Sequence, residues 1–283
     1  MDISEVGFAD ALYSSLVRTE VIHEEATQLR RSFRDAKSPL SVVRQEAYRE
    51  IASRIEQSLA VGPPRSTAAL TSLESHVNDV IRTTRAALCA PPPSSPVADW
   101  AVPAGAVTDS EVCALLLVLQ VACLFSPPVQ KRALDDGILK LLLHRIPTAS
   151  PALACACFDL IMAIQLRQPA AFVAFVDLDG IKEVSNVLKH STDRVRAHAA
   201  RFLNLQLTQL APNMVVMARA SSAAGEDDQA ALVEAAAETA KRVVEEVLGR
   251  EAAAMLMRYV DLGDVQAEGR LSQLASALQF FIG

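Results

Sequence analysis

The stretch LDDGILK at residues 134–140 recurs as DLDGIKE at residues 177–183, and the central glycines of the two copies lie 43 residues apart. An apolar run broken by proline precedes each copy, at FSPP (125–128) and LRQP (166–169), and a second apolar run follows each copy. A period of roughly 40–47 residues built from helices is typical of armadillo and HEAT repeats. Each such unit can bury its apolar face only against a neighbour. The sequence therefore predicts an all-α fold of the armadillo/HEAT-like α-solenoid type.

The composition favours helices and an intracellular location. Hydrophobic residues, mostly Ala and Leu, make up 51% of the 283 residues, whereas aromatic residues make up 5%; this mix favours helix over strand. The net charge of −6 argues against a nucleic-acid partner. The longest apolar run, residues 112–125, is shorter than the about 20 residues of a membrane span. Five cysteines without disulfide-like spacing indicate buried thiols in a reducing compartment, so we expect a cytoplasmic protein that does not insert into membranes.

Changes in composition along the chain divide it into five segments. A stretch rich in proline interrupts the helical pattern, and a small, polar, acidic stretch follows the repeats. Trp100, the only tryptophan, lies in the proline-rich stretch, where it either pins the linker to the body or anchors a partner. The predicted segments are an N-terminal helical cap (1–90), a proline-rich linker (91–107), armadillo-like repeats (108–213), an acidic flexible loop (214–229) and a C-terminal helical cap (230–283).

Short signals predict where helices begin and end. The sequence TDSE at 108–111 is a capping box, in which a hydroxyl and a carboxylate each satisfy a free backbone N–H. Gly137 and Gly180 are predicted to turn the chain between helices, because glycine readily adopts a left-handed conformation. Pro212 is predicted to end the last helix of the repeats, since proline cannot donate the backbone hydrogen bond there.

The C-terminal part contains an amphipathic pattern with helical spacing. The apolar stripe either packs on the last repeat or pairs with a helix of a partner. Further helices are predicted over 250–260 and 271–282. The stripe consists of Val233, Ala237, Ala240, Val244 and Val247.

No motif for catalysis, cofactor binding or metal binding is present in the sequence. Neither glycine-rich phosphate-binding pattern occurs, and HEE at 23–25 lacks the second histidine of a zinc-protease helix. Cys155 and Cys157 would lie about 200° apart on a helix, too far around it to chelate one ion together. We therefore expect no catalytic, cofactor-binding or metal-binding residue, and we expect the chain to act through a surface.

An α-solenoid commonly binds its partner on a concave surface. In armadillo-like units the third helix usually lines that surface, so its polar positions are the candidates for contact with a peptide or domain. Arg194 and Arg196 lie in the same region of the sequence. The alternative is that all these positions form an ordinary solvated face. The predicted protein-binding residues are Lys140, His144, Lys182, Glu183, Asn186, Lys189, Arg201 and Asn204.

Several short segments of the repeat region carry a resemblance to a known family. The resemblance is carried by LQ at 119–120 with FSPP at 125–128, by DGILKLLL at 136–143, by SPA at 150–152 and by DGIKEVSNVLK at 179–189. These features are similar to the septation initiation network scaffold known as the cell division control protein fourteen family, which is distinct from the phosphatase of that name. The proline-rich linker and the acidic loop depart from the family pattern.

The resemblance implies a non-enzymatic adaptor that binds and supports a germinal-centre-type protein kinase in septation and cytokinesis. It also implies a location at the spindle pole body. The alternative is an armadillo-like scaffold with a different protein partner. An α-helical enzyme would instead need a pocket with convergent titratable side chains, and no cluster in the sequence predicts one.

Overall fold

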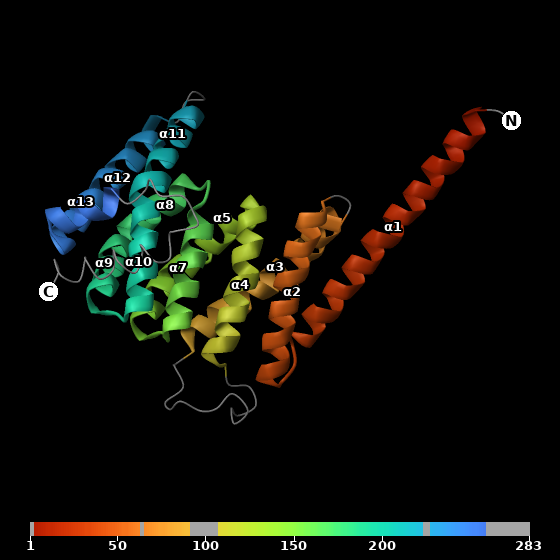
Figure 1. Ribbon diagram of the computed structural model, residues 1–283, viewed down its shortest axis with the longest axis horizontal. Coiled ribbons are helices and arrows are strands. Elements are labelled where there is room, and N and C mark those ends of the chain that lie inside the picture. Colours follow the sequence, from red (N-terminus) through yellow and green to blue (C-terminus); the bar gives the residue numbers. More distant parts are fainter. Residues whose placement is uncertain (1–2, 63–64, 91–106, 223–226, 259–283) are drawn as a thin grey trace. The chain divides into compact units, whose positions relative to one another are not determined.

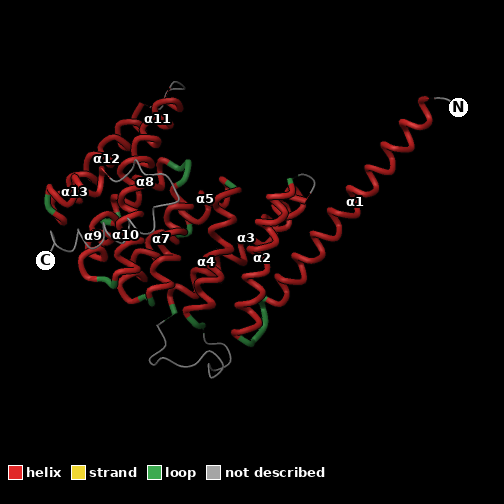
Figure 2. Tube along the Cα trace, in the orientation of Figure 1, coloured by secondary structure: helices red, strands yellow, loops and turns green. Residues whose placement is uncertain are grey.

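The computed structural model describes residues 3–62, 65–90, 107–222 and 227–258, and all regular secondary structure in these residues is helical (Figure 2). The all-α prediction is therefore confirmed. The chain divides into two compact units, residues 1–129 and 130–283. This boundary falls inside the repeat region predicted at 108–213. None of the described helices combines the length and the apolar character needed to cross a membrane.

The first unit is a group of long helices that pack on one another (Figure 1). Helix α2 packs on α1, α3 and α4, and α3 also packs on α1 and α4. Leu29, Ile51, Leu73 and Leu119 contribute one buried side chain from each helix in turn, so the four helices share an apolar interior. The helices are α1 (Ile3–Asp35), α2 (Ser41–Val61), α3 (Arg65–Cys89) and α4 (Asp109–Phe125).

The start of α4 confirms half of the predicted capping box. The Thr108 hydroxyl accepts a hydrogen bond from the Glu111 backbone N–H at 3.1 Å. The Glu111 side chain, however, does not return to the cap: its carboxylate binds Arg44 and Ser41 of α2. A charged partner from another helix has replaced the local backbone donor, because a hydrogen bond between two ionised groups is stronger than one to a neutral N–H.

A recurrent helix order begins with the last long helix of the first unit and continues through the second unit (Figure 1). A long helix, a short helix that starts at a proline and a third helix occur as α4, α5 and α6, and again as α7, α8 and α9. The solenoid arrangement of these helices stays a prediction. After α4, the helices are α5 (Pro127–Asp135), α6 (Ile138–Arg145), α7 (Pro151–Gln165), α8 (Pro169–Asp177), α9 (Gly180–His190), α10 (Asp193–Leu205), α11 (Ala211–Ser222), α12 (Asp227–Leu248) and α13 (Arg250–Arg258).

The two repeated glycines have different conformations. Gly137 is left-handed, with φ of 73°, as predicted. In the second copy Asp179 takes the left-handed conformation, with φ of 57°, and Gly180 is the first residue of α9. The prediction that Gly180 makes the turn is therefore wrong. Asp tolerates the left-handed region better than most residues, and Gly180 is instead packed against Phe175, whose ring and carbonyl oxygen would overlap an added Cβ.

Two boundaries near the end of the repeats were predicted incorrectly. Pro212 does not end a helix but lies in α11, directly after a π-helical segment at Gln206–Leu210. The Ala211 N–H donates to the Gln206 carbonyl, five residues back, and this wider turn accommodates a residue that cannot donate. The predicted loop at 214–229 is also wrong over most of its length, because Ala211–Ser222 and Asp227–Leu248 are helices.

The amphipathic stripe of α12 packs inside the second unit, as one of the two alternatives predicted. Val233, Ala240 and Val244 are fully buried, and α12 packs on α8, α9 and α11. Helix α13 confirms the helix expected at 250–260 as far as Arg258. Trp100 and the helix predicted over 271–282 lie outside the described residues.

Candidate protein-binding surface

Helix α9 presents four of the predicted binding residues. Its Ile181, Val184 and Leu188 side chains are buried, and this apolar face packs on α10 and α12. The polar residues between them therefore lie on the outer face. Lys182 is exposed there, and its neighbours are partly exposed; the partly exposed residues are Glu183, Asn186 and Lys189.

Helices α6 and α10 supply three more exposed candidates. On α6, burial of Ile138, Leu139 and Leu142 leaves Lys140 and His144 in solvent. On α10, Arg201 is exposed beside the buried Ala200 and Phe202. Helix α10 packs on both α7 and α9, and α6 packs on α7. These contacts hold the helices that carry the candidate side chains in one compact unit.

The remaining candidates are engaged within the chain. Asn204 donates from Nδ2 to the Leu256 carbonyl oxygen at 2.5 Å, which ties α10 to α13. Arg196 is buried and donates to the Leu188 and Ser191 carbonyl oxygens at 3.1 and 2.8 Å. It thereby satisfies carbonyl groups at the C-terminal end of α9, which a helix otherwise leaves without partners. Both residues stabilise the unit rather than offer a free surface.

The seven other candidates share a property that matters for binding. Within the described part of the chain, none of their side chains forms a hydrogen bond or an ion pair. Lys140, Lys182, Lys189 and Arg201 are cations and Glu183 is the one anion, so the set carries a net charge of +3 with His144 neutral. The whole chain carries −6. The seven candidate residues are therefore net basic on an acidic protein.

A polar group on α7 and α10 lies close to these residues in the sequence and was not predicted. His198 Nε2 lies 2.9 Å from Asp159 Oδ1, and the imidazole stacks on Phe158 with ring centroids 6.0 Å apart. Burial raises the pKa of the Cys155 thiol, although Arg194 opposes that shift. A thiol with a raised pKa is a weak nucleophile at neutral pH. The group can therefore position charge at the surface, but it does not form an activated Cys–His pair.

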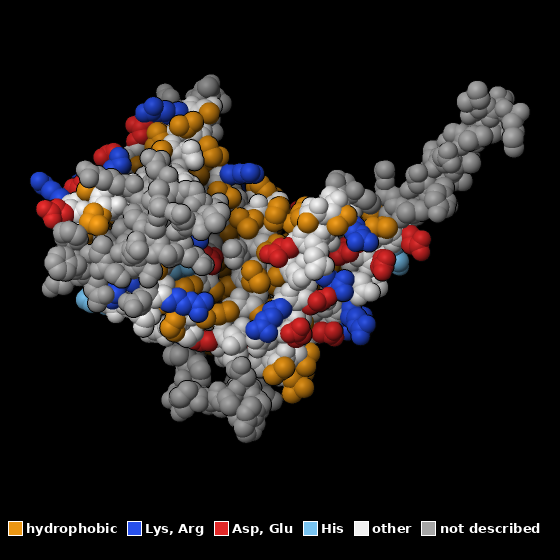
Figure 3. Space-filling view, in the orientation of Figure 1, with side chains coloured by type: hydrophobic (Ala, Val, Ile, Leu, Met, Phe, Trp, Pro, Cys, Tyr) orange, Lys and Arg blue, Asp and Glu red, His pale blue; other side chains and the backbone are white. Residues whose placement is uncertain are grey.

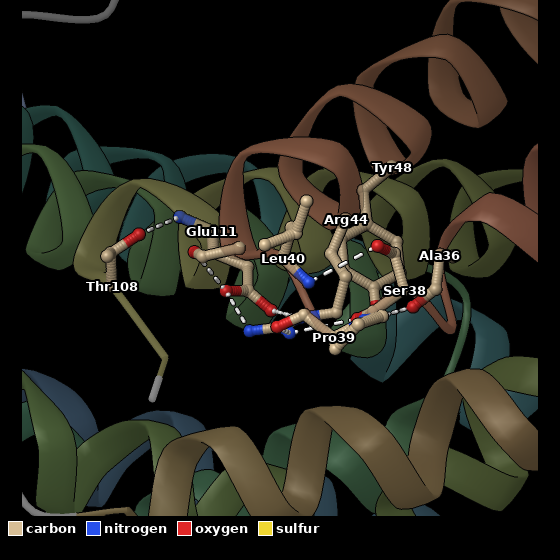
Figure 4. A network of polar contacts seen from close by, with 9 residues as sticks. Ala36, Ser38, Pro39, Leu40, Arg44, Tyr48, Thr108 and Glu111 are labelled. Atoms are coloured by element: carbon tan, nitrogen blue, oxygen red, sulfur yellow. Dashed lines mark hydrogen bonds and ion pairs between the residues drawn. The ribbon is translucent and has the colours of Figure 1, made fainter. Parts of the chain in front are cut away.

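A second polar network lies in the first unit (Figure 4). Arg44 donates from Nε and Nη2 to the two carboxylate oxygens of Glu111 at 2.6 and 2.9 Å, and the Ser41 hydroxyl donates to the same carboxylate at 2.6 Å. The hydrogen bond to Glu111 raises the pKa of Arg44. Only 12% and 4% of the Arg44 and Glu111 side chains are exposed. The pair therefore joins α2 to α4 inside the unit.

No group of three or more His, Cys, Asp or Glu side chains among the described residues is placed to hold a metal ion. Burial raises the pKa of Cys123 to about 12, so this thiol stays protonated.

No protein-family model, curated protein or solved structure matches the chain.

Proposed function

We propose that the protein is a non-catalytic adaptor that binds another protein through the outer faces of α6, α9 and α10. The observation that carries the proposal is the set of seven exposed or partly exposed polar side chains that form no bond within the described chain. A partner can pair with these side chains without breaking a bond within the described chain, which offsets the cost of about 0.5–1.5 kcal/mol for ordering each long side chain. The excess of cations favours an acidic segment or domain as that partner.

We further propose that α4–α6 and α7–α9 are armadillo-like repeats. The recurrent helix order and the prolines that open α5 and α8 support this architecture. An armadillo-like stack would align the third helices α6 and α9 along one surface. The proposed binding residues belong to these two helices and to α10, which follows them.

For the partner, the resemblance of residues 119–189 to the septation scaffold family supports a germinal-centre-type protein kinase. The proposed role is to bind and support this kinase during septation and cytokinesis, in the cytoplasm and at the spindle pole body. The alternative is an armadillo-like scaffold with a different protein partner, for which the same basic face would serve.

The test is affinity capture with charge reversal. The wild-type chain is used to capture proteins from dividing fungal cells, and germinal-centre-type kinases are then tested individually as purified proteins. Lys182→Glu combined with Arg201→Glu should weaken binding about tenfold, which corresponds to about 1.4 kcal/mol, and should reduce the dependence of the association rate on salt.

The matched control is Lys131→Glu on α5 combined with Arg250→Glu on α13, which makes the same change in charge at exposed positions outside the candidate surface. This control should bind as the wild type does. Equal weakening by the two pairs would show a general charge effect and contradict the proposed surface. Capture of a different protein that is sensitive to Lys182→Glu would favour the alternative partner.

A further inference from the structure

A groove on the first unit runs between α1 and α3, two helices that pack on each other. Its volume is about 340 Å³. Ile22 of α1 is 37% exposed in its lining, and Thr67, Thr71 and Ser75 of α3 are exposed there as well. Hydrophobic side chains lie among charged ones where this unit reaches the surface (Figure 3). Most of the lining is therefore open to solvent.

The two ends of the groove differ in chemistry. On α1, the lining residues Ile22, Ala26 and Arg30 are four residues apart and form one row along the helix. Phe33, just beyond this row, stacks on His76 of α3 with ring centroids 4.1 Å apart. The α3 residues in the lining all precede position 76, so the two helices run in the same direction along the groove. Arg30 therefore lies at the end nearer His76, and Ile22 lies at the other end.

Several hydrogen-bond donors of the groove lack partners. Within the described residues, the side chains of Arg30 and Thr71 form no hydrogen bond or ion pair, and none of the lining residues is Asp or Glu. Ser72 also lines the groove; it is 7% exposed, and its Oγ has no hydrogen-bond partner among those residues. A buried hydroxyl without a partner is unfavourable, and an acceptor bound in the groove would supply that partner after a rotation about the Ser72 Cα–Cβ bond. One guanidinium with hydroxyl donors beside it suits a ligand that carries a single negative charge.

The end of the groove away from Arg30 is apolar. Ala26 is half-buried and Ala68 is 6% exposed, and together with Ile22 they form the apolar part of the lining. The row from Ile22 to Arg30 extends roughly 12 Å along the helix. An unbranched alkyl chain laid along this row would be removed from water, which is favourable. The groove thus combines a place for a charged head group with a place for a short apolar chain.

We propose that the groove between α1 and α3 binds a small amphiphilic carboxylate. The carboxylate accepts hydrogen bonds from the Arg30 guanidinium and the Thr71 hydroxyl, and the alkyl chain lies along Ile22, Ala26 and Ala68. A phosphate monoester, with a charge of about −1.5 to −2 at neutral pH, would exceed the one cation that the lining offers, whereas a carboxylate matches it. The site lies on the first unit and is independent of the protein-binding residues proposed on α6, α9 and α10.

The test uses the full chain and two probes with the same alkyl chain, octanoate and the uncharged octanol. Isothermal titration calorimetry should show saturable binding of octanoate at millimolar concentration. Arg30→Gln should weaken octanoate binding about three- to fivefold, the range of an exposed ion pair, and should leave octanol binding unchanged. Arg31→Gln is the matched control, because Arg31 is exposed on the same helix, forms no bond within the described residues and does not line the groove. This control should bind both probes as the wild type does.

A second pair of variants tests the position of the alkyl chain. Ala26→Phe should fill the groove and abolish binding of both probes, whereas Thr27→Phe, at an exposed neighbouring position outside the lining, should retain it. Circular dichroism checks that each variant is folded. Absence of saturable octanoate binding to the wild type would overturn the proposal. Equal weakening by Arg30→Gln and Arg31→Gln would also overturn it, as would octanoate binding that persists in a folded Ala26→Phe variant.

Discussion

Replacing Glu111 tests whether the buried Arg44–Glu111 pair holds α2 and α4 together. Glu111→Ala removes the acceptor of two Arg44 hydrogen bonds and of the Ser41 hydroxyl. The Arg44 side chain, only 12% exposed, would keep its contacts to the Ser38 and Pro39 carbonyl oxygens but lose its counter-charge. Removing one partner of a buried ion pair typically costs about 3–5 kcal/mol. We therefore expect the free energy of unfolding to fall by about that amount.

A double substitution separates the loss of the partner from the value of the pair itself. A buried ion pair contributes little more to stability than two apolar residues of similar size, because burial removes both ions from water. Replacing such a pair by apolar residues is therefore often neutral or stabilising by about 1–4 kcal/mol. Arg44→Met with Glu111→Leu should therefore be markedly more stable than Glu111→Ala alone. The expected coupling between the two positions is of the order of 2–3 kcal/mol, because they share one network.

Urea unfolding followed by circular dichroism measures these differences through the shift in the transition midpoint. The control is Glu50→Ala. Glu50 pairs with Arg54 on the same helix α2, but the two side chains are 43% and 31% exposed. An exposed pair contributes at most about 1 kcal/mol. The reasoning is refuted if Glu111→Ala lowers the free energy of unfolding no more than Glu50→Ala does. It is also refuted if Arg44→Met with Glu111→Leu lowers it by the sum of the losses that the two substitutions cause singly.

Three further predictions can be checked on the same protein. Gly180→Ala should cost at least about 2 kcal/mol in urea unfolding, because its Cβ would overlap Phe175, whereas Gly137→Ala, with open space around it, should cost about 1–2 kcal/mol for its left-handed backbone. Gln130→Ala should cost about 2 kcal/mol in the same assay, because Gln130 donates to the Ala163 and Leu166 carbonyl oxygens at 2.9 and 2.8 Å. Burial raises the pKa of Tyr48 to about 12. The neutral phenol therefore contributes about 3 kcal/mol to the free energy of unfolding below pH 10, and this contribution is lost as the pH rises through 12. Ultraviolet titration should show a late phenol ionisation that Tyr48→Phe removes.

Local signals were sufficient to predict most of the helices. Pro127, Pro151 and Pro169 each begin a helix, where a missing N–H costs nothing. The stripe on α12 is buried as its spacing predicts, except for the half-buried Val247. Both features depend only on residues within one or two helical turns, so they can be predicted from the local sequence.

The errors arose where contacts distant in sequence override local preference. The loop at 214–229 was predicted from the small, polar and acidic residues 220–229, yet Met214 and Ala218 are buried and α11 packs on α12. Pro212 was predicted to end a helix because proline lacks an N–H, and the π-helical turn before it removes that difficulty. Neither outcome can be read from residue type, because each depends on the packing of the finished unit.

The candidate binding residues show the same contrast between local and distant contacts. Exposure of Lys140, Lys182 and Arg201 follows from helical spacing. The engagement of Asn204 does not, because its partner Leu256 lies 52 residues further along the chain. The Arg44–Glu111 pair, separated by 67 residues, is likewise absent from any local pattern. Spacing can thus predict which face of a helix is polar, but it cannot predict which polar side chains other helices have already engaged.

Gly137 and Gly180 occupy equivalent positions in the two copies of the repeated stretch but have different structural roles. Five residues before Gly180 is Phe175, which is fully buried and meets Phe202 of α10 edge-on at 5.7 Å. Five residues before Gly137 is Arg132, whose side chain is 53% exposed and lies 3.7 Å from Asp136. The Phe175 ring lies against the first turn of α9, so position 180 requires a residue without a Cβ. The left-handed conformation is found at the preceding residue, Asp179. At Gly137 no described atom lies within 4 Å of an added Cβ, so this glycine is required for its left-handed backbone and not for its packing.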